Sequence, residues 1–339
     1  MSTGYERTAA VVVGREALPG EPRVIILAKH DDLHALAVAA EIQTISNSSA
    51  AVLSVSRYPQ DWYLTQSIGV AGGLDWIIHA KELDIGSDQL TGVWLREVIA
   101  PRISPRIKIK KVRRFGRNEA AAALSGWLLS LGQNVVNPLA AQDTADRKPY
   151  QLFVAGKVGL SIPKTVVTNN PAVANEFISR LDGQVIFKGL TKPGCQFIET
   201  RLFQRAHFSK LKAVEFAPVI FQEAVEAIAD IRVTIIDDTV FSVSIAPQNR
   251  RARYDWRLDI ASSKIEPHAL PKRIERKLIS FMRILALRYG AIDMRLTPSG
   301  DYIFLEVNTH GVFLFCEIEA GQQISQALAR ALLRRREAL

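Results

Sequence analysis

Two carboxylates and one amide occupy alternating positions in the stretch YGAIDMRLTPSGDYIFLEVN, which covers residues 289–308. Two alternating runs flank a TPSG cluster of turn-forming residues, and this pattern predicts a β-hairpin. Because successive side chains of a strand point to opposite faces, Asp293 and Arg295 share one face, as do Glu306 and Asn308. A connecting loop of about four residues then places Asp293 opposite Glu306, to within one register step.

The polar face of this predicted hairpin allows two interpretations. Carboxylate and amide oxygens suit Mg²⁺, so Asp293, Glu306 and Asn308 are candidate metal ligands. A half-buried hairpin whose polar face is simply solvated has the same spacing. The hairpin alone gives the two interpretations equal weight, and the decision depends on the rest of the chain.

Cationic residues near other predicted elements favour polyphosphate chemistry. They are Lys148, Lys188, Arg232, Arg257 and Arg295. Phosphoryl transfer requires cations that hold phosphate oxygens, and oxygen ligands that hold the Mg²⁺ bridging them. A glycine-containing loop at 190–198 could cover the phosphates and exclude water. The sequence lacks GxxxxGK[ST], HExxH, CxxC and GxSxG, so P-loop, zinc-hydrolase and serine-hydrolase chemistry is not supported.

Length and composition describe an ordinary globular protein of two or three domains. The chain has 339 residues, of which 48% are hydrophobic and 23% charged. No apolar run is long enough to span a bilayer, and the N-terminus lacks a signal-peptide core, so no membrane partner is expected. The two cysteines, Cys195 and Cys316, are far apart, have no metal-type spacing and are expected to be bystanders. Without a disulfide framework, a reducing cytoplasm is the predicted compartment.

A net charge of +9 favours an anionic partner. The excess is concentrated in residues 102–117 (RISPRIKIKKVRRFGR) and in the tail 330–336. Solvated basic faces are the favoured interpretation of both. A docking surface for an acidic peptide comes second. Nucleic acid comes third, because neither stretch has the interleaved aromatic residues of a base-stacking surface.

The predicted order of elements begins with a parallel α/β unit. After an extension at 1–22, a buried strand at 23–29, a helix capped by Asp31 or Asp32 and a strand at 50–56 are expected. Further strand-like runs lie at 74–79, 91–96 and 107–112, and a helix is predicted over 118–132. No glycine-rich loop follows the first strand, so dinucleotide binding is not expected here.

The second half alternates short strands and helices. Helices are predicted over 144–156, from Pro171 to Gly183, from Pro271 to Gly290 and from about 318. Strands are predicted at 184–190, 199–204 and 218–225, together with a hairpin that turns at Asp237–Asp238. The predicted domains are 23–140, then 141–220 with the loop 190–198, then 221–339 with the acidic hairpin.

From about residue 21 to its end, the chain resembles the ATP-grasp superfamily, and more narrowly the ligases that mature microviridin-type peptides (graspetides). The resemblance is carried by ILAKHDDLHALAVAAEI, VNPLAAQDTADRKPYQLFVAGKVGLSIPKTVVTNNPAVANEF, VIFKGL, FQEAVEAIADIRVTIIDD, DWR, LRYGAIDMRLTPSGDYIFLEVN and GVFLFCEIEAG. It implies an α/β fold in which an N-terminal parallel α/β domain precedes a two-part ATP-grasp domain with α+β subdomains. ATP and Mg²⁺, as two ions, are the implied cofactors.

The resemblance also implies roles for individual residues. The lysines that bind the nucleotide phosphates correspond to Lys148 and Lys188, and the segment that contacts adenine corresponds to Gln222, Glu223 and Val225. The ribose contact corresponds to Glu226, with Ala227 or Ile228 as alternatives. The Mg²⁺ ligands correspond to Asp293, Glu306 and Asn308, and the cations near the γ-phosphate and the substrate carboxylate correspond to Arg232, Arg257 and Arg295. The loop 190–198 matches the mobile lid.

In that family, a carboxylate is activated by ATP and captured by a hydroxyl or amine. The implied partner is a precursor peptide with a leader and a core rich in acidic and hydroxyl side chains. This sequence has Thr309-His310-Gly311-Val312 where the family usually continues Pro-x-Gly-Gln, which puts substrate choice in doubt. His310 is a candidate general base, although a hydrogen-bonded structural histidine is the favoured interpretation.

Two further functions stay open at this point. One is a ligase that adds amino acids to a protein tail or a small substrate, as the ribosomal-protein glutamate ligase does. The other is an inactive ATP-grasp module that binds a peptide or nucleic acid. The presence of Lys148, Lys188, Asp293, Glu306 and Asn308 disfavours the inactive form. The sequence allows a homodimer and does not decide the oligomeric state.

Overall fold

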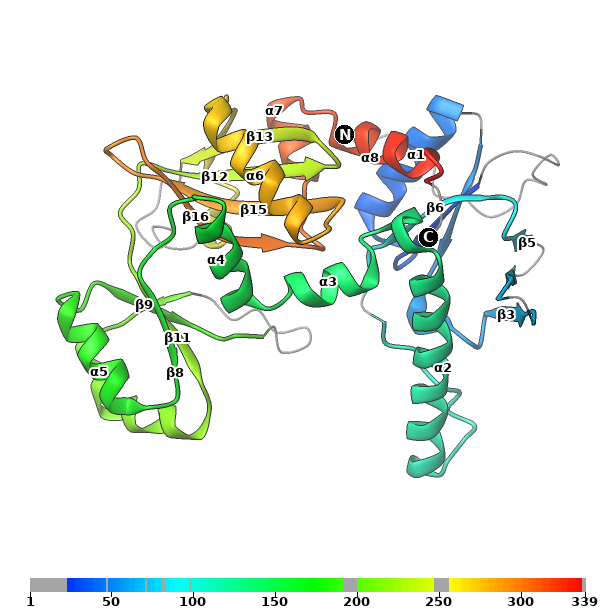
Figure 1. The fold of residues 1–339 in the computed structure, drawn as a ribbon, viewed down its shortest axis with the longest axis horizontal. Helices are drawn as coiled ribbons and strands as arrows, with labels where there is room; N and C mark the ends of the chain where they lie inside the picture. Colours follow the sequence, from blue (N-terminus) through cyan, green and yellow to red (C-terminus); the bar gives the residue numbers. More distant parts are fainter. Residues whose placement is uncertain are drawn as a thin grey trace.

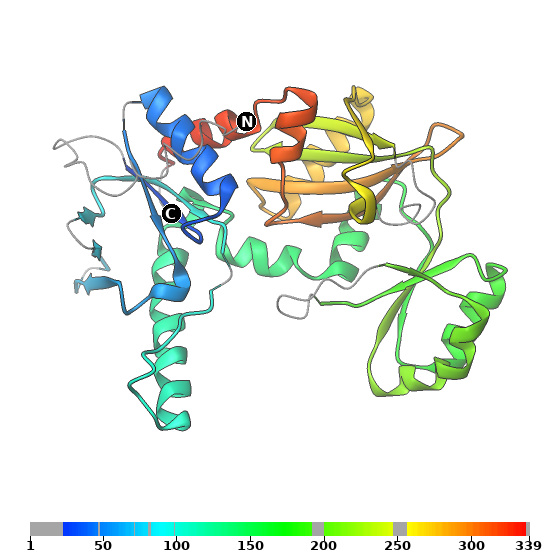
Figure 2. The same cartoon turned by 180° about the vertical axis from the view of Figure 1, so that it is seen from behind.

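The structure is a computed structural model that describes residues 23–46, 48–70, 72–80, 83–97, 99–191, 200–246 and 256–336. The predicted extension 1–22, Cys195 and most of the loop 190–198 lie outside this part of the chain. Figures 1 and 2 show an N-terminal unit at one end, and a small and a larger sheet at the other. Within the described residues, no helix has the length and apolarity needed to cross a membrane.

The N-terminal unit is built on a parallel sheet. Its strand order is β2 (Ala50–Leu53), β1 (Arg23–Leu27), β6 (Leu90–Leu95), β7 (Val135–Val136). The predicted parallel pairing of the first two strands is confirmed. Asp32 caps α1 (Leu33–Ser46) by accepting hydrogen bonds from the amides of His34 and Ala35, at 2.9 Å and 3.1 Å.

Helix α1 packs on one face of the parallel sheet, and an antiparallel sheet and a long helix cover the opposite face. They are β3 (Trp62–Ile68), β4 (Leu74–Ala80), β5 (Leu83–Gly86) and α2 (Lys110–Ser130). The strands β3 and β5 were not predicted. The predicted strand at 107–112 is wrong, because α2 begins at Lys110 rather than at 118. Alternating Ile and Lys imitates a strand there, but Lys and Arg are good helix formers and extend the helix backwards.

Two short helices replace the single helix predicted over 144–156. They are α3 (Leu139–Ala145) and α4 (Lys148–Lys157). Pro149 has no amide hydrogen to donate to the Ala145 carbonyl, so the helix ends and restarts with Pro149 in its first turn. The side chain of Gln151 donates to that carbonyl instead.

The small sheet is four-stranded, and a helix and a 3₁₀ segment pack on one of its faces. Its order is β10 (Arg201–Leu202), β9 (Val185–Lys188), β11 (Val219–Glu223), β8 (Thr165–Thr168). Helix α5 (Pro171–Arg180), which is capped by Asn170, and the 3₁₀ segment Arg205–Phe216 pack on that face. The other face is directed away from α5 and carries polar residues.

The larger sheet is antiparallel and five-stranded. Its order is β14 (Lys264–Pro267), β13 (Thr239–Ala246), β12 (Ala229–Ile236), β15 (Tyr289–Leu296), β16 (Tyr302–Asn308). The predicted turn at Asp237–Asp238 joins β12 to β13, with Asp237 at φ 51°. Helices α4 and α6 (Lys272–Ile284) pack against one apolar face.

Gly290 does not stop the helix that begins after Pro271, contrary to the prediction. Helix α6 ends at Ile284, the chain reverses through Ala286 at φ 53°, and Gly290 already belongs to β15. A Cβ at Gly290 would lie 2.7 Å from the side chain of Met282 and 2.9 Å from that of Val307. Glycine is needed here because α6 lies close against the sheet.

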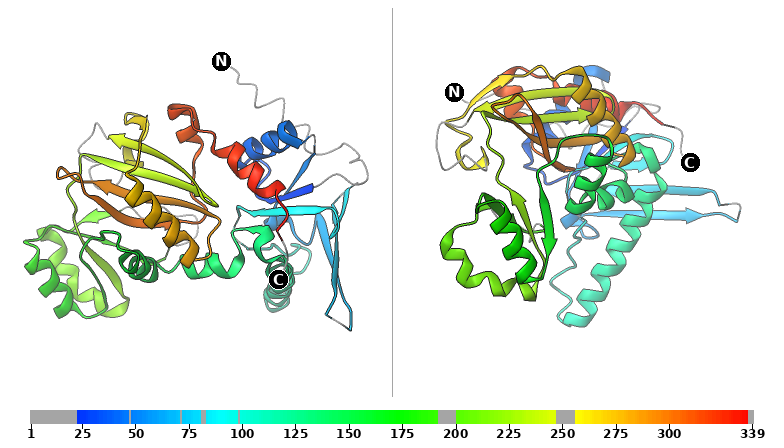
Figure 3. Two further views of the ribbon diagram at one scale, coloured as in Figure 1. Left: turned by 45° about the horizontal axis from the view of Figure 1, so that its top comes forward. Right: turned by 60° about the vertical axis from the view of Figure 1, so that its left-hand side comes forward.

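The C-terminal helices α7 (Leu314–Ala320) and α8 (Ile324–Leu333) return the chain to the N-terminal unit. Helix α8 packs beside α1, and both contribute to one apolar cluster with β1 and β12–β13 (Figure 3). The first and last parts of the chain therefore share a core.

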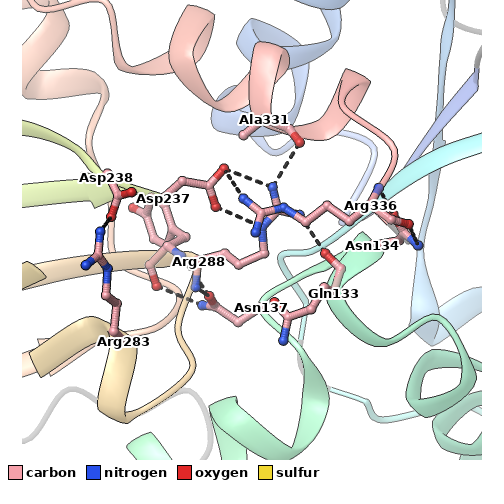
Figure 4. A network of polar contacts seen from close by, with 10 residues as sticks. Gln133, Asn134, Asn137, Asp237, Asp238, Arg283, Arg288, Ala331 and Arg336 are labelled. Atoms are coloured by element: carbon pink, nitrogen blue, oxygen red, sulfur yellow. Dashed lines mark hydrogen bonds and ion pairs between the residues drawn. The ribbon is translucent and has the colours of Figure 1, made fainter. Parts of the chain in front are cut away.

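A buried polar network joins the N-terminal unit to the larger sheet (Figure 4). Arg288, which is 3% exposed, pairs with Asp237 at 2.9 Å and donates to the carbonyls of Gln133 and Ala331 at 2.8 Å and 3.0 Å. Asn137 accepts from the amides of Arg288 and Tyr289, at 2.9 Å and 2.7 Å. Side chains thus satisfy the main chain where β7 approaches β15.

Candidate active site

The acidic hairpin forms with the register predicted from the sequence. Asp293 on β15 lies opposite Glu306 on β16, and a bulge follows Asp293. Ile292, Met294, Phe304 and Val307 pack in one apolar cluster with residues of α4 and α6. On the other face, strand alternation and pairing group Arg232 of β12 with Asp293, and Asp230 with Arg295. This face of the larger sheet is therefore lined by charged residues.

Arg232 neutralises Asp293. Its Nη1 donates to Asp293 Oδ1 at 2.8 Å, and the two residues are 3% and 9% exposed. Burial is the largest influence and would lower the pKa of the Arg232 guanidinium, but Asp293, together with Tyr289 and Cys316, holds that pKa above its ordinary value. The guanidinium also lies 5.9 Å from the ring centroid of Trp256, which packs beneath it.

The face of the small sheet that points away from α5 supplies the first lysine. Lys188 is directly opposite Ile220, and Gln222 is opposite both Ile186 and Thr165, so these side chains share the face away from α5. Gln222 is fully buried and donates to Thr165 Oγ1 at 2.9 Å, while its Oε1 has no hydrogen-bond partner among the described residues. An unsatisfied buried acceptor on this face suits a ligand with an N–H donor.

The second lysine comes from α4. Lys148 occupies the first position of that helix, and its Nζ lies 3.2 Å from Glu306 Oε2 on β16. The side chains are 18% and 13% exposed, so the pair is partly buried but open to solvent on one side.

Lys188 lies close enough to Lys148 and to the acidic face for their charges to change its pKa. Burial lowers the pKa of Lys188, Glu306 and Asp293 oppose that decrease, and Lys148 and Arg257 add to it. Residues from β9, α4, β15, β16 and the 3₁₀ segment at Trp256–Asp259 therefore converge on one site. Three cations facing two carboxylates leave an excess of positive charge, as a polyphosphate requires.

The predicted adenine-contacting segment lies where the two sheets meet. Glu223 ends β11 and accepts from the Lys164 amide at 3.2 Å, and Glu226 is exposed. The carbonyl of Val225 accepts from Arg295 Nη1 at 2.8 Å. Arg295 also pairs with Asp230 at 3.2 Å and is 6% exposed. Its guanidinium therefore holds the segment between the two sheets through the Val225 carbonyl.

Three oxygen-bearing side chains could hold Mg²⁺. Asn308 Nδ2 lies 3.4 Å from Glu306 Oε1, and Glu306 faces Asp293 across the hairpin. The described residues contain no group of three or more His, Cys, Asp or Glu side chains fit to bind a metal. Two carboxylates and an amide fit Mg²⁺ nevertheless, because this ion is commonly held by one or two carboxylates together with phosphate oxygens and water.

The sequence did not reveal which residues hold the segment after Asn308. His310 is half-buried, and its carbonyl accepts from Arg96 Nη1, which comes from the end of β6. Arg96 in turn pairs with Asp32 at 3.3 Å. Asp32 and Arg96 each follow a strand of the parallel sheet. Because the carboxyl ends of parallel strands meet at one edge of a sheet, the sequence could have predicted that these two residues lie close together.

Many solved structures resemble this fold, among them three peptide ligases. Macrocyclase MdnC from Microcystis aeruginosa MRC, bound with precursor peptide MdnA, gives a TM-score of 0.79 at 28% identity over 92% of this chain and 99% of that chain. The Chryseobacterium gregarium RiPP-associated ATP-grasp ligase, in complex with ADP and a leader and core peptide, gives 0.84 at 25% identity over 94% and 99%. ATP-grasp ligase PsnB, complexed with minimal precursor, Mg and ADP, gives 0.72 at 23% identity over 94% and 99%. No protein-family model and no curated protein matches the sequence.

Proposed function

On the premise that this chain has the ATP-grasp fold and is similar to peptide macrocyclases, we propose that it is an ATP- and Mg²⁺-dependent ligase. It activates side-chain carboxylates of a ribosomally made precursor peptide and joins them to hydroxyl or amine side chains of the same peptide. The observation that carries the proposal is the convergence of Lys148, Lys188 and Arg257 on Glu306 and Asp293. The similarity to MdnC and to the Chryseobacterium ligase extends over more than nine-tenths of the chain.

Each part of the nucleotide has a group that suits it. Lys188 and Lys148 neutralise phosphate oxygens, and Gln222 and the Val225 segment flank the base. Asp293, Glu306 and Asn308 would hold Mg²⁺, which would supply charge neutralisation for the phosphates. Arg257 is exposed beside this cluster and is placed to attract the substrate carboxylate.

The reaction has two steps. A carboxylate oxygen of the peptide attacks the γ-phosphorus of ATP, the bond to the β,γ-bridging oxygen breaks, and ADP leaves with the bonding electrons. A hydroxyl or amine of the peptide then attacks the acyl carbon, inorganic phosphate leaves, and the nucleophile loses its proton. His310 is the candidate acceptor of that proton. The product is an ester or an amide, and one water is lost from the peptide per link.

The test is a mass measurement on a peptide. A short peptide encoded beside the gene, with a core rich in Thr, Ser, Asp and Glu, is incubated with the enzyme and Mg-ATP. The proposal predicts that the peptide loses the mass of one water for each ADP released. Fragmentation mass spectra should assign each loss to an acidic side chain and a hydroxyl or amine partner.

Two control variants test whether the mass loss depends on the candidate metal site. Asp293→Asn should abolish both ADP release and mass loss while the protein remains folded by circular dichroism. Asp301→Asn changes an exposed carboxylate in the turn of the same hairpin and should keep activity. Gain of amino-acid masses by the peptide would instead support a tail-adding ligase, and ATP-independent peptide binding would support an inactive module.

A further inference from the structure

The segment that follows the metal ligands, Thr309–Phe313, is fixed by side chains from distant parts of the chain. Each of its first four carbonyls accepts a hydrogen bond: from Asn137 Nδ2 at 3.5 Å, from Arg96 Nη1, from Tyr289 Oη at 2.6 Å and from Arg232 Nη2 at 2.9 Å, in order along the segment. The amide of Phe313 donates to His34 Nε2 at 3.1 Å. A loop this fully bonded holds one conformation.

Burial alternates along this segment. Thr309, Gly311 and Phe313 are buried, whereas His310 is half-buried and Val312 is 45% exposed. Gly311 cannot carry a side chain, because a Cβ would lie 2.2 Å from that of Ala291. Strand β16 ends at Asn308, and the Gly311 amide donates to the Asn308 carbonyl at 3.4 Å, so the chain turns directly after the last candidate metal ligand. The segment stays beside the metal-ligand face because Arg232 bonds both Asp293 and the Val312 carbonyl.

The N-terminal unit reaches this segment through one charged arrangement. Arg96 is bound to the His310 carbonyl and paired with Asp32, and both lie at the carboxyl edge of the parallel sheet. His34 accepts from Phe313, so its Nε2 is unprotonated and the proton is on Nδ1, 3.6 Å from Asp32. Arg96 and Asp32 are 10% and 22% exposed, so the pair is shielded from solvent.

We propose that Arg96, oriented by Asp32, is a positioning residue that holds His310 and Val312 beside the metal-ligand face and thereby sets the acceptor side of the site. This inference rests on the proposed function. The groups that contact the nucleotide lie on the two sheets and on α4, and none of them depends on Arg96. Loosening the segment therefore spares nucleotide binding and carboxylate activation, and it slows capture of the activated carboxyl by the acceptor.

Such a defect has a distinct signature, because an acyl phosphate that is not captured is hydrolysed. Water attacks the acyl carbon, phosphate leaves, and the peptide carboxylate returns unchanged while ADP accumulates. The ratio of ADP released to links formed therefore reports on acceptor positioning. A loss of folding would lower both quantities together and leave the ratio unchanged.

The experiment compares Arg96→Gln with Arg57→Gln. Arg57 lies in the same unit and also pairs with an aspartate, but its pair with Asp61 is exposed. Mg-ADP affinity, ADP release, link formation and hydrogen exchange of peptides covering 309–314 are measured on each intact protein. Arg96→Lys, which keeps a donor but loses the planar fork, should be intermediate.

For Arg96→Gln we expect Mg-ADP affinity within about twofold of wild type and link formation slowed by about tenfold or more. The ratio of ADP to links should rise, and exchange in 309–314 should accelerate while exchange in β15 does not change. Arg57→Gln should match wild type. An unchanged ratio with unchanged exchange overturns the proposal, as does a parallel loss of ADP binding and linking.

The exchange measurement separates this inference from the proposed function. If wild-type enzyme forms no links with any candidate peptide, the proposed function fails, and accelerated exchange in Arg96→Gln still supports a positioning role. If wild type forms links but Arg96→Gln matches it in both ratio and exchange, the positioning role fails and the proposed function stands.

Discussion

Arg232 joins a candidate metal ligand to the segment that follows the other two. Its guanidinium donates to Asp293 Oδ1 at 2.8 Å and to the carbonyl of Val312 at 2.9 Å. One buried cation therefore sets the position of Asp293 on β15 and of the main chain beyond Asn308. Arg96 and Arg232 bond different carbonyls of that segment, so the pair between Arg232 and Asp293 does not require Arg96.

Arg232→Met should destabilise the protein by about 3–5 kcal/mol, because it leaves Asp293 buried without its cation. Urea unfolding monitored by circular dichroism measures the change. Mg²⁺ should restore part of the stability, since an ion that binds only the folded state raises its free energy of unfolding. The double variant with Asp293→Asn should be more stable than Arg232→Met alone, and additive losses would contradict the pairing.

Lys188→Met should weaken Mg-ADP binding by about tenfold or more without destabilising the free protein, because a desolvated charge is removed. The lowered pKa of Lys188 means that the unfolded chain binds this proton more tightly than the folded one. Wild-type stability should therefore rise relative to Lys188→Met as the pH approaches 10.5, the ordinary value. The exposed Lys210→Met is the control for both measurements.

Asp237→Asn should cost about 2–4 kcal/mol, because Arg288 would stay buried without its anionic partner. Asparagine tolerates the positive φ of 51°, so the substitution tests the charge rather than the turn. Asp238→Asn is the matched control: its pair with Arg283 is exposed and should contribute about 0.5 kcal/mol or less. Equal losses in the two variants would contradict the importance of the network in Figure 4.

Asp32 should make stability depend on acid pH. Burial alone would raise its pKa, but the hydrogen bond with His34, the charge of Arg96 and the Ala35 amide lower it to about 2. A depressed carboxyl pKa stabilises the fold above the unfolded value of 3.8 and ceases to do so as the pH falls through about 2. Between pH 5 and pH 2, wild type should lose about 2 kcal/mol more than Asp32→Asn. Asp61→Asn should follow wild type.

The sequence predicted the acidic hairpin well because its signals are local. Alternation and a turn cluster determined the face and register of Asp293 and Glu306, and the bulge did not disturb that pair. The resemblance likewise predicted an ATP-grasp fold, which the solved structures confirm. Predictions failed where one signal had two meanings, as for the basic stretch at 107–112 and for Gly290, which serves close packing rather than helix termination.

Contacts between distant parts of the chain were beyond local patterns. Arg96 and Asp32 precede His310 by more than two hundred residues, and only the folded sheet brings them to it. The end of α3 before Lys148 was also missed, although Pro149 provided a signal for it. Roles that depend on tertiary contacts require the structure, whereas residue types and spacing suffice for a hairpin.

Mg²⁺-dependent nucleotide binding tests the central claim, that Lys148, Lys188 and the acidic hairpin form one Mg-ATP site. Calorimetric titration of a non-hydrolysable ATP analogue, with and without Mg²⁺, is carried out on wild type and on Glu306→Gln. Wild type should bind the ATP analogue at least about tenfold more tightly with Mg²⁺ than without it, and Glu306→Gln should lose most of that difference while remaining folded. Equal Mg²⁺ dependence in both proteins, or none in wild type, would contradict the account.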